Sequence, residues 1–84
     1  LKIDLHIESL CSGYNEMDSF QIMDYQLEVC RKYINKAVYG KYNKLEIIHG
    51  IGSGLLKSEV HKILKNYNLR FFESRDGGST QVIL

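Results

Sequence analysis

The sequence has no proline and no tryptophan among its 84 residues, and it has only two cysteines, Cys11 and Cys30. No proline-marked linker divides the chain, and 84 residues make one domain with no room for a second. No apolar run approaches the roughly 18 residues of a membrane-spanning helix. The residues given contain no basic leader followed by an apolar stretch, so no secretory signal is visible in them. We therefore expect a single domain over residues 1–84 without a membrane partner.

The number and spacing of the cysteines and the balance of charges limit the kinds of site and partner that we expect. Cys11 and Cys30 do not have the spacing of a metal or redox motif, so nothing requires an oxidising compartment and we expect the cytoplasm. The 11 basic and 10 acidic residues leave a formal net charge of +1, so binding to nucleic acid would depend on a local basic patch. Because the sequence starts at Leu1 inside a strand-like segment, we expect it to be the C-terminal piece of a longer protein.

The first half of the chain predicts a strand, a loop and a long helix. Apolar and polar residues alternate over residues 1–6, which is typical of a half-buried strand, and the polar stretch 8–15 predicts a loop. Asp18 or Ser19 is placed to cap a helix, with Gln21 in the position of a capping box, and Gly40 is the expected stop. The apolar face of this helix is predicted to comprise Phe20, Met23, Leu27, Cys30, Ile34 and Ala37.

The second half predicts a strand, a helix and a hairpin. Residues 45–49 form a short apolar run that is consistent with a buried strand. Ser53 is placed to cap a second helix, whose inward residues are Leu56, Val60, Ile63 and Leu64. Strands over residues 69–73 and 80–84 are joined by turn residues 76–78. The order is βαβαββ, and the strand–helix–strand start implies that the first two strands are parallel.

Two motifs follow these parallel strands. Asp4 and His6 end the first strand on one face, and residues 49–54, with the sequence HGIGSG, end the second strand and open a helix. Both motifs should reach the carboxyl edge of the sheet, where open α/β sheets place ligands. Glycines and free helix N–H groups suit a phosphate, and histidines move protons near neutral pH. Asp4 is expected either to orient a histidine or to hold a metal, and Lys57 adds a positive charge.

Each feature also has a plain structural interpretation. A lone Asp4, His6 or His49 is more often a satisfied polar residue than a catalytic one, and the lysines of the second helix are usually its solvated face. The glycine run matches neither the dinucleotide fingerprint nor the P-loop. Only the meeting of both motifs at one edge favours a functional site.

The two motifs resemble those of the Smr (small MutS-related) domain family. Residues 3–6, IDLH, are similar to the family's LDLHG motif, and residues 47–57, IIHGIGSGLLK, are similar to its HGxGxGxLR/K motif. Residues 77–83, GGSTQVI, resemble its closing glycine-and-strand segment. The resemblance spans nearly the whole chain. It implies an α/β (α+β) two-layer sandwich, a mixed four-stranded sheet packed by two helices, similar to the C-terminal domain of bacterial translation initiation factor three.

The resemblance also implies DNA or RNA binding and endonuclease activity, connected with DNA repair and recombination or with ribosome rescue. The implied catalytic residues are Asp4, His6 and His49, and the residues expected to bind phosphate are Gly50, Gly52, Ser53, Gly54 and Lys57. The sequence does not decide the cofactor: a divalent ion such as magnesium or manganese is one candidate, whereas cleavage of RNA through its 2′-hydroxyl would need no metal. One position departs from the family pattern, because Ile7 stands where LDLHG has glycine, so we expect a less permissive backbone after His6.

Three functions follow as hypotheses. The leading one is an endonuclease that acts on DNA or RNA. The second is a non-catalytic module that docks other domains of its parent chain onto nucleic acid or a ribosome, which the low net charge and Ile7 favour. The third is a small-molecule phosphate or nucleotide binder that uses the same glycine loop.

Overall fold

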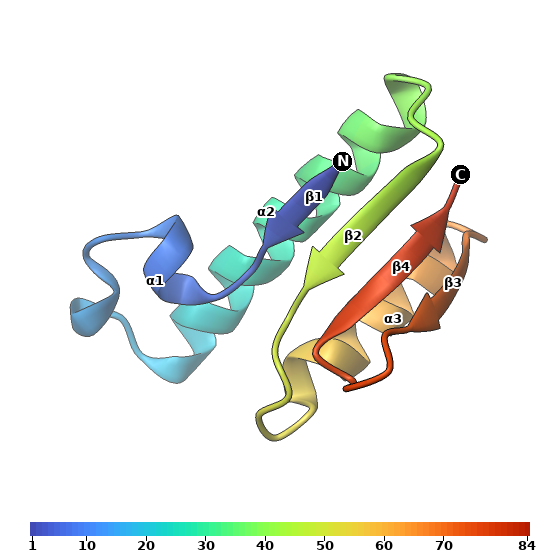
Figure 1. Ribbon diagram of the computed structural model, residues 1–84. Coiled ribbons are helices and arrows are strands. Elements are labelled where there is room, and N and C mark those ends of the chain that lie inside the picture. Colours follow the sequence, from blue (N-terminus) through green and yellow to red (C-terminus); the bar gives the residue numbers. More distant parts are fainter.

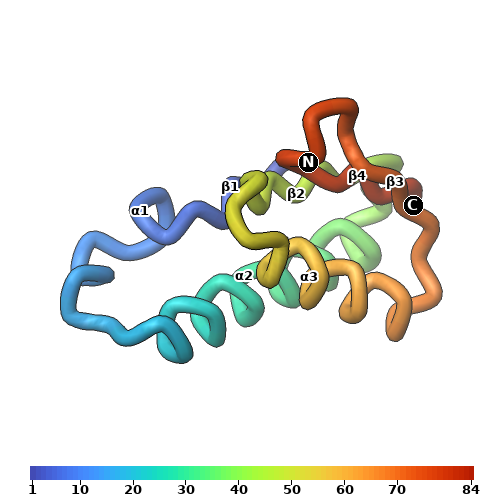
Figure 2. The backbone as a smooth tube through the Cα atoms, turned by 90° about the horizontal axis from the view of Figure 1, so that it is seen from below, coloured from blue at the N-terminus to red at the C-terminus, as the bar shows by residue number.

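The computed structural model describes all 84 residues and has a four-stranded sheet covered by helices (Figure 1). The elements in chain order are β1 (Lys2–Asp4), α1 (Ile7–Leu10), a 3-10 turn η1 (Tyr14–Glu16), α2 (Ser19–Tyr39), β2 (Lys44–Ile48), α3 (Leu55–Asn66), β3 (Arg70–Glu73) and β4 (Ser79–Ile83). The long helices α2 and α3 lie side by side on one face of the sheet and leave the other face open (Figure 2). The predicted two-layer α+β arrangement is confirmed.

The sheet is mixed, with the strand order β1-β2-β4-β3. β1 pairs parallel with β2, whereas β4 pairs antiparallel with both β2 and β3. Parallel strands need a crossover connection, and α2 supplies it. The carboxyl ends of β1 and β2 therefore meet at one edge of the sheet, as the sequence predicts.

Helix α2 begins and ends where the sequence predicts. The Asp18 carboxylate accepts from the backbone N–H of Gln21 at 2.8 Å, and the Gln21 side chain accepts from the N–H of Asp18 at 2.9 Å, which completes the capping box. After the helix, a Cβ on Gly40 would lie 2.6 Å from the carbonyl oxygen of Lys36. Gly40 is thus required by a close backbone approach rather than by a positive φ.

The prediction that Phe20 belongs to the buried apolar face of α2 is wrong. Its side chain is 81% exposed, whereas Leu27, Cys30, Ile34 and Ala37 are buried. The amino end of α2 extends past the end of β1 (Figure 1), so no strand covers its first turn. Helical spacing places Phe20 on the correct side of the helix, but the sheet does not reach that far.

The predicted loop over residues 8–15 is also corrected. Ile7–Leu10 form the one-turn helix α1, and Tyr14–Glu16 form a 3-10 turn. The N–H of Cys11 donates to the carbonyl oxygen of Ile7 at 2.9 Å and closes the turn of α1. A single helical turn is too short to produce an apolar period, so the sequence pattern does not reveal it.

The core lies between the sheet and the two long helices. Its fully buried side chains come from every layer and include Leu5, Ile34, Leu45, Ile47, Val60, Leu64 and Val82. None of the helices has both the length and the apolar character needed to cross a membrane. Cys30 belongs to this core as predicted, and its burial raises the pKa of the thiol to about 12.

Replacing Ile34 by alanine is expected to lower the free energy of unfolding by about 2–5 kcal/mol, because a fully buried side chain leaves a cavity. Phe20→Ala is the matched control on the same helix. Since Phe20 is largely exposed, its loss is expected to cost less than about 0.5 kcal/mol. Urea unfolding of both variants measures this difference, and an equal loss for Phe20→Ala would contradict the burial of Ile34 and the exposure of Phe20.

The two thiols are expected to react at very different rates with an aromatic disulfide reagent at about pH 8. Cys11 is partly exposed and should react promptly. Cys30 should react only after unfolding, because burial keeps its thiol protonated and covered. A Cys11→Ser variant separates the two signals. Rapid labelling of that variant in its native state would show that the Cys30 environment opens readily.

Candidate active site

The motifs that follow β1 and β2 meet at the edge where these strands end. The N–H of Leu5 donates to the carbonyl oxygen of Ile48 at 2.8 Å and extends the parallel pairing beyond β1. His6 then lies against Gly50, so close that a Cβ on Gly50 would be 2.9 Å from Nε2 of His6. Asp4, His6 and Gly50 are therefore brought together, although more than forty residues separate the motifs.

Asp4 and His6 form a hydrogen-bonded pair. Oδ1 of Asp4 accepts from Nδ1 of His6 at 2.7 Å and from the backbone N–H of His6 at 2.9 Å. The backbone N–H of His6 is the largest cause that holds the pKa of Asp4 below its usual value; burial opposes it, and the hydrogen bond and charge of the imidazole lower the pKa further. An ionised carboxylate only accepts, so Nδ1 carries the proton and Nε2 of the neutral ring is left as an acceptor.

Nε2 of His6 is accessible to a ligand. The side chains of Asp4 and His6 are each 44% exposed. A shallow cavity of about 470 Å³ opens beside the imidazole. The residues that line it are His6, Glu46, Ile48, Gly50, Ile51, Asp76, Gly78 and Ser79. Nε2 of His6 has no hydrogen-bond partner in the protein, so it is available to a ligand bound in this cavity.

The glycine loop between β2 and α3 presents unpaired amides. Gly50, Gly52 and Gly54 have φ values of +81°, +33° and +85°, which other residues rarely adopt. The N–H groups of residues 51–54 donate to no protein acceptor, and those of Leu56 and Lys57 lie in the first turn of α3, where helical N–H groups have no intrahelical partner. Successive free N–H groups in such a loop form a concavity that binds anions.

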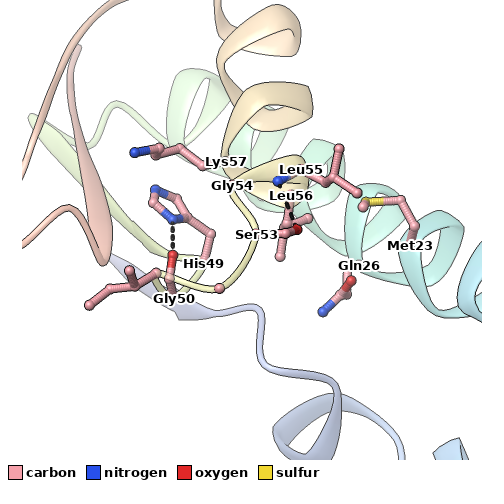
Figure 3. A pocket seen from close by; sticks show the side chains of 11 residues that line it. Met23, Gln26, His49, Gly50, Ser53, Gly54, Leu55, Leu56 and Lys57 are labelled. Atoms are coloured by element: carbon pink, nitrogen blue, oxygen red, sulfur yellow. Dashed lines mark hydrogen bonds between the residues drawn. The ribbon is translucent and has the colours of Figure 1, made fainter.

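The cavity beside this loop has a volume of about 230 Å³ (Figure 3). Ser53 lies at its rim but does not cap α3 as predicted. The N-cap is Gly54 in the left-handed conformation, and the Ser53 hydroxyl accepts only a long hydrogen bond of 3.4 Å from the N–H of Leu55. The left-handed glycine turns the chain into the helix, so no side-chain cap is needed to start it.

Lys57 and His49 lie on the same side of the loop (Figure 3). Nζ of Lys57 lies 3.5 Å from Oε2 of Glu73 on β3, so its charge is partly compensated within the protein. His49 is only 6% exposed. Its Nδ1 lies 2.9 Å from the carbonyl oxygen of Gly50 and its Nε2 lies 2.8 Å from Oγ1 of Thr80. The side chain of His49 is thus buried toward the helices and is not joined to the Asp4–His6 pair.

The predicted metal site is not formed by protein side chains alone. No three or more His, Cys, Asp or Glu residues are grouped so that they could hold a metal ion. Asp4 contributes one carboxylate, of which Oδ1 is already engaged by His6. A cation at this position would therefore depend on water and substrate oxygens for most of its ligands.

Sequence reasoning missed Gln26 of α2. This side chain is buried, and its Nε2 donates to the carbonyl oxygen of Leu5 at 2.9 Å, one residue before His6. The signal was a polar residue at a helical spacing within an apolar face. Ile7, which stands where the family motif has glycine, begins α1 and has no positive φ, so its backbone conformation is open to any residue.

Comparison with known proteins gives several matches. The Smr domain family matches residues 23–83. An endonuclease MutS2 from Borreliella burgdorferi is 35% identical over 86 residues, which cover 98% of this chain. A putative endonuclease MutS2 from Bacillus subtilis is 42% identical and an endonuclease MutS2 from Aquifex aeolicus is 44% identical, each over 57% of the chain. No solved structure matches.

The chain spans 11% of the length of the Borreliella protein and 7% of each of the other two. The family match contains the whole unit of β2, glycine loop and α3, where the free amides lie. The Borreliella alignment extends the similarity over almost the entire chain, β1 included. This chain therefore belongs to the Smr domain family.

Proposed function

We propose that this domain is an endonuclease module that binds a nucleic-acid strand and cleaves a phosphodiester bond. The observation that carries the proposal is the position of His6. Its Nδ1 is hydrogen-bonded to Asp4, its Nε2 has no partner within the protein, and His6 lines a cavity that also borders Gly50 and Ile51 of the glycine loop. The names of the MutS2 relatives, which describe endonucleases, support the same reaction class.

The glycine loop provides the phosphate-binding step. A phosphate that accepts from the amides of residues 51–54 would lie near His6, because Gly50 contacts the imidazole at the start of the loop. The positive end of α3 favours the same negative charge. A backbone phosphate is present at every nucleotide, so this recognition supports binding without sequence preference.

His6 provides the proton-transfer step. Nε2 takes a proton from a water molecule, or from the 2′-hydroxyl of RNA, as the oxygen attacks phosphorus. The amides stabilise the negative charge that develops on the non-bridging oxygens. The bond to the leaving oxygen breaks, and the protonated imidazole or water supplies its proton. Asp4 holds the ring in the productive tautomer and stabilises the imidazolium.

The partners follow from this chemistry. DNA and RNA both carry the phosphate that the loop recognises, and the 2′-hydroxyl distinguishes them as substrates. We propose other domains of a longer chain, and the ribosome, as further partners on the basis of the family resemblance. A module that binds without cutting is the alternative, and the net charge of +1 is the observation that favours it.

Asp4→Asn and His6→Ala are each expected to reduce kcat for cleavage by about 100- to 10,000-fold, because each removes part of the general base. The assay uses labelled branched DNA, duplex DNA and structured RNA, each with magnesium, manganese or EDTA. Asp24→Asn is the matched control. It removes one negative charge, as Asp4→Asn does, but from an exposed side chain of α2.

Full activity in Asp4→Asn and His6→Ala would overturn the catalytic assignment. Salt-sensitive binding to nucleic acid without cleavage by the unsubstituted protein would replace the endonuclease with the docking module. Binding of a mononucleotide without affinity for either polymer would instead favour the small-molecule alternative.

Gly50→Ala is expected to abolish most of the cleavage activity. The new Cβ would lie 2.9 Å from Nε2 of His6 and displace the imidazole, and the left-handed backbone would cost about 1–2 kcal/mol of stability. Gly77→Ala is the control in the β3–β4 turn, because its φ of +77° imposes a similar strain but its Cβ would approach only Nζ of Lys57, at 3.9 Å. Thermal unfolding and cleavage rates are measured for both, and equal losses of activity would contradict the role of the His6 contact.

A further inference from the structure

Behind the glycine loop, three side chains form a polar cluster that the proposed cleavage does not use. His49 follows β2, Thr80 lies on β4 and His61 lies on α3. Oγ1 of Thr80 lies 2.8 Å from Nε2 of His49 and 2.8 Å from Nε2 of His61. Thr80 is fully buried and His49 nearly so. Two imidazoles thus share one hydroxyl in the layer between the sheet and α3.

The hydrogen bonds of this cluster all donate in the same direction along the series of residues. The carbonyl oxygen of Gly50 only accepts, so Nδ1 of His49 carries the proton that it donates. With a single proton on the ring, at Nδ1, Nε2 of His49 accepts from the Thr80 hydroxyl, whose single hydrogen is thereby used. The second contact of Oγ1 must be a hydrogen bond donated by Nε2–H of His61. The chain runs from His61 through Thr80 and His49 to the carbonyl of Gly50.

The charges around His61 agree with a neutral ring at the start of this chain. Burial is the main cause that lowers the pKa of His61. The carboxylate of Glu73 on β3 opposes this effect, whereas His49, Lys57 and Lys65 reinforce it. The ring also packs on Phe71 of β3 at a centroid distance of 4.7 Å. These contacts hold the imidazole so that its Nε2–H is aimed at Thr80.

The chain ends on the residue that contacts His6. His49 holds the carbonyl of Gly50, and the carbonyl of Gly78 accepts from the N–H of Gly50 at 2.9 Å. Both peptide groups of Gly50 are therefore fixed, and its Cα packs directly against the imidazole of His6. The position of the loop relative to Nε2 of His6 depends on these bonds.

We propose that Thr80 and His61 are positioning residues of the active site, which set the glycine loop against His6 through the buried side chain of His49. In this proposal His49 acts on Gly50 and does not transfer a proton to the substrate, because both of its ring nitrogens are occupied within the protein. The predicted effect on cleavage rests on the proposed function, whereas the hydrogen-bond chain itself can be tested without it.

The first test compares Thr80→Val, which keeps the side-chain shape and removes the hydroxyl, with Thr80→Ser, which keeps the hydroxyl. Thr80→Val is expected to lower kcat about tenfold or more with little change in KM, since a small displacement of catalytic groups is costly. Thr80→Ser is expected to stay within about threefold of the original kcat, less than a tenfold step. Ile34→Val on α2 is the control for a loss of core packing alone, and its kcat should not change.

The second test detects the chain without any substrate. Nitrogen-15 NMR of the imidazoles at neutral pH should find His49 protonated at Nδ1 and His61 at Nε2, in the unsubstituted protein and in Thr80→Ser. Loss of the fixed His49 tautomer is expected in Thr80→Val. If that variant does not fold, His61→Leu replaces it, with His61→Gln as the partner that retains an N–H donor near the position of Nε2.

The outcomes separate the two proposals. The chain is overturned if Thr80→Val keeps both the tautomer and kcat, or if a folded Thr80→Ser fails as Thr80→Val does. An absence of cleavage in the unsubstituted protein would reject the endonuclease proposal. The hydrogen-bond chain would then be tested by the NMR measurement of the His49 and His61 tautomers alone. An Nε2-protonated His49 in the unsubstituted protein would reject the chain regardless of activity.

Discussion

The parallel pairing of β1 with β2 is the constraint on which the rest of the structure depends. The hydrogen bond from Leu5 to Ile48 continues this pairing to the point where both strands end. Parallel neighbours cannot be joined by a tight turn, so the chain must make the crossover through α2 and bury one face of that helix. The capping box at Asp18 and the close approach at Gly40 fix the ends of the crossover. Gln26 then ties the middle of the helix back to Leu5.

The pleat of β2 divides the histidines between two environments. Ile48 and His49 are consecutive, so their side chains lie on opposite faces of the sheet. Ile48 is paired with Asp4 and shares the open side with His6, whereas His49 points toward the helices and is buried. The exposed histidine keeps a free nitrogen, and the buried one has partners at both nitrogens. The two motif histidines thus differ in exposure and in hydrogen bonding because their side chains lie on opposite faces of the sheet.

Local patterns predicted the parts of the fold that local physics decides. The start and end of α2, the order of the strands along the chain, the parallel pairing of the first two and the meeting of Asp4 and His6 with the glycine loop all follow from caps, periodicity and the geometry of parallel strands. The exposure of Phe20 depends on where the sheet ends, which helical spacing does not encode. His61 and Thr80 are nineteen residues apart and meet only through tertiary packing, so no local sequence motif indicates their contact. The sequence favours Ser53 as the cap of α3, whereas the structure uses Gly54 in the left-handed conformation, which has no side chain that a sequence pattern could reveal.

The outer strands have a consequence for self-association. β1 has three residues and β3 has four, and these are the two strands with a free edge. A free edge with unpaired backbone groups is a template for a strand of another molecule, and short, charged edge strands resist such pairing. Lys2 and Asp4 supply charges on one edge, and Arg70 and Glu73 supply them on the other. Short length and charged residues therefore make both edges of the sheet poor templates for a strand of another molecule, and Asp4, which accepts from His6, is one of these charged positions.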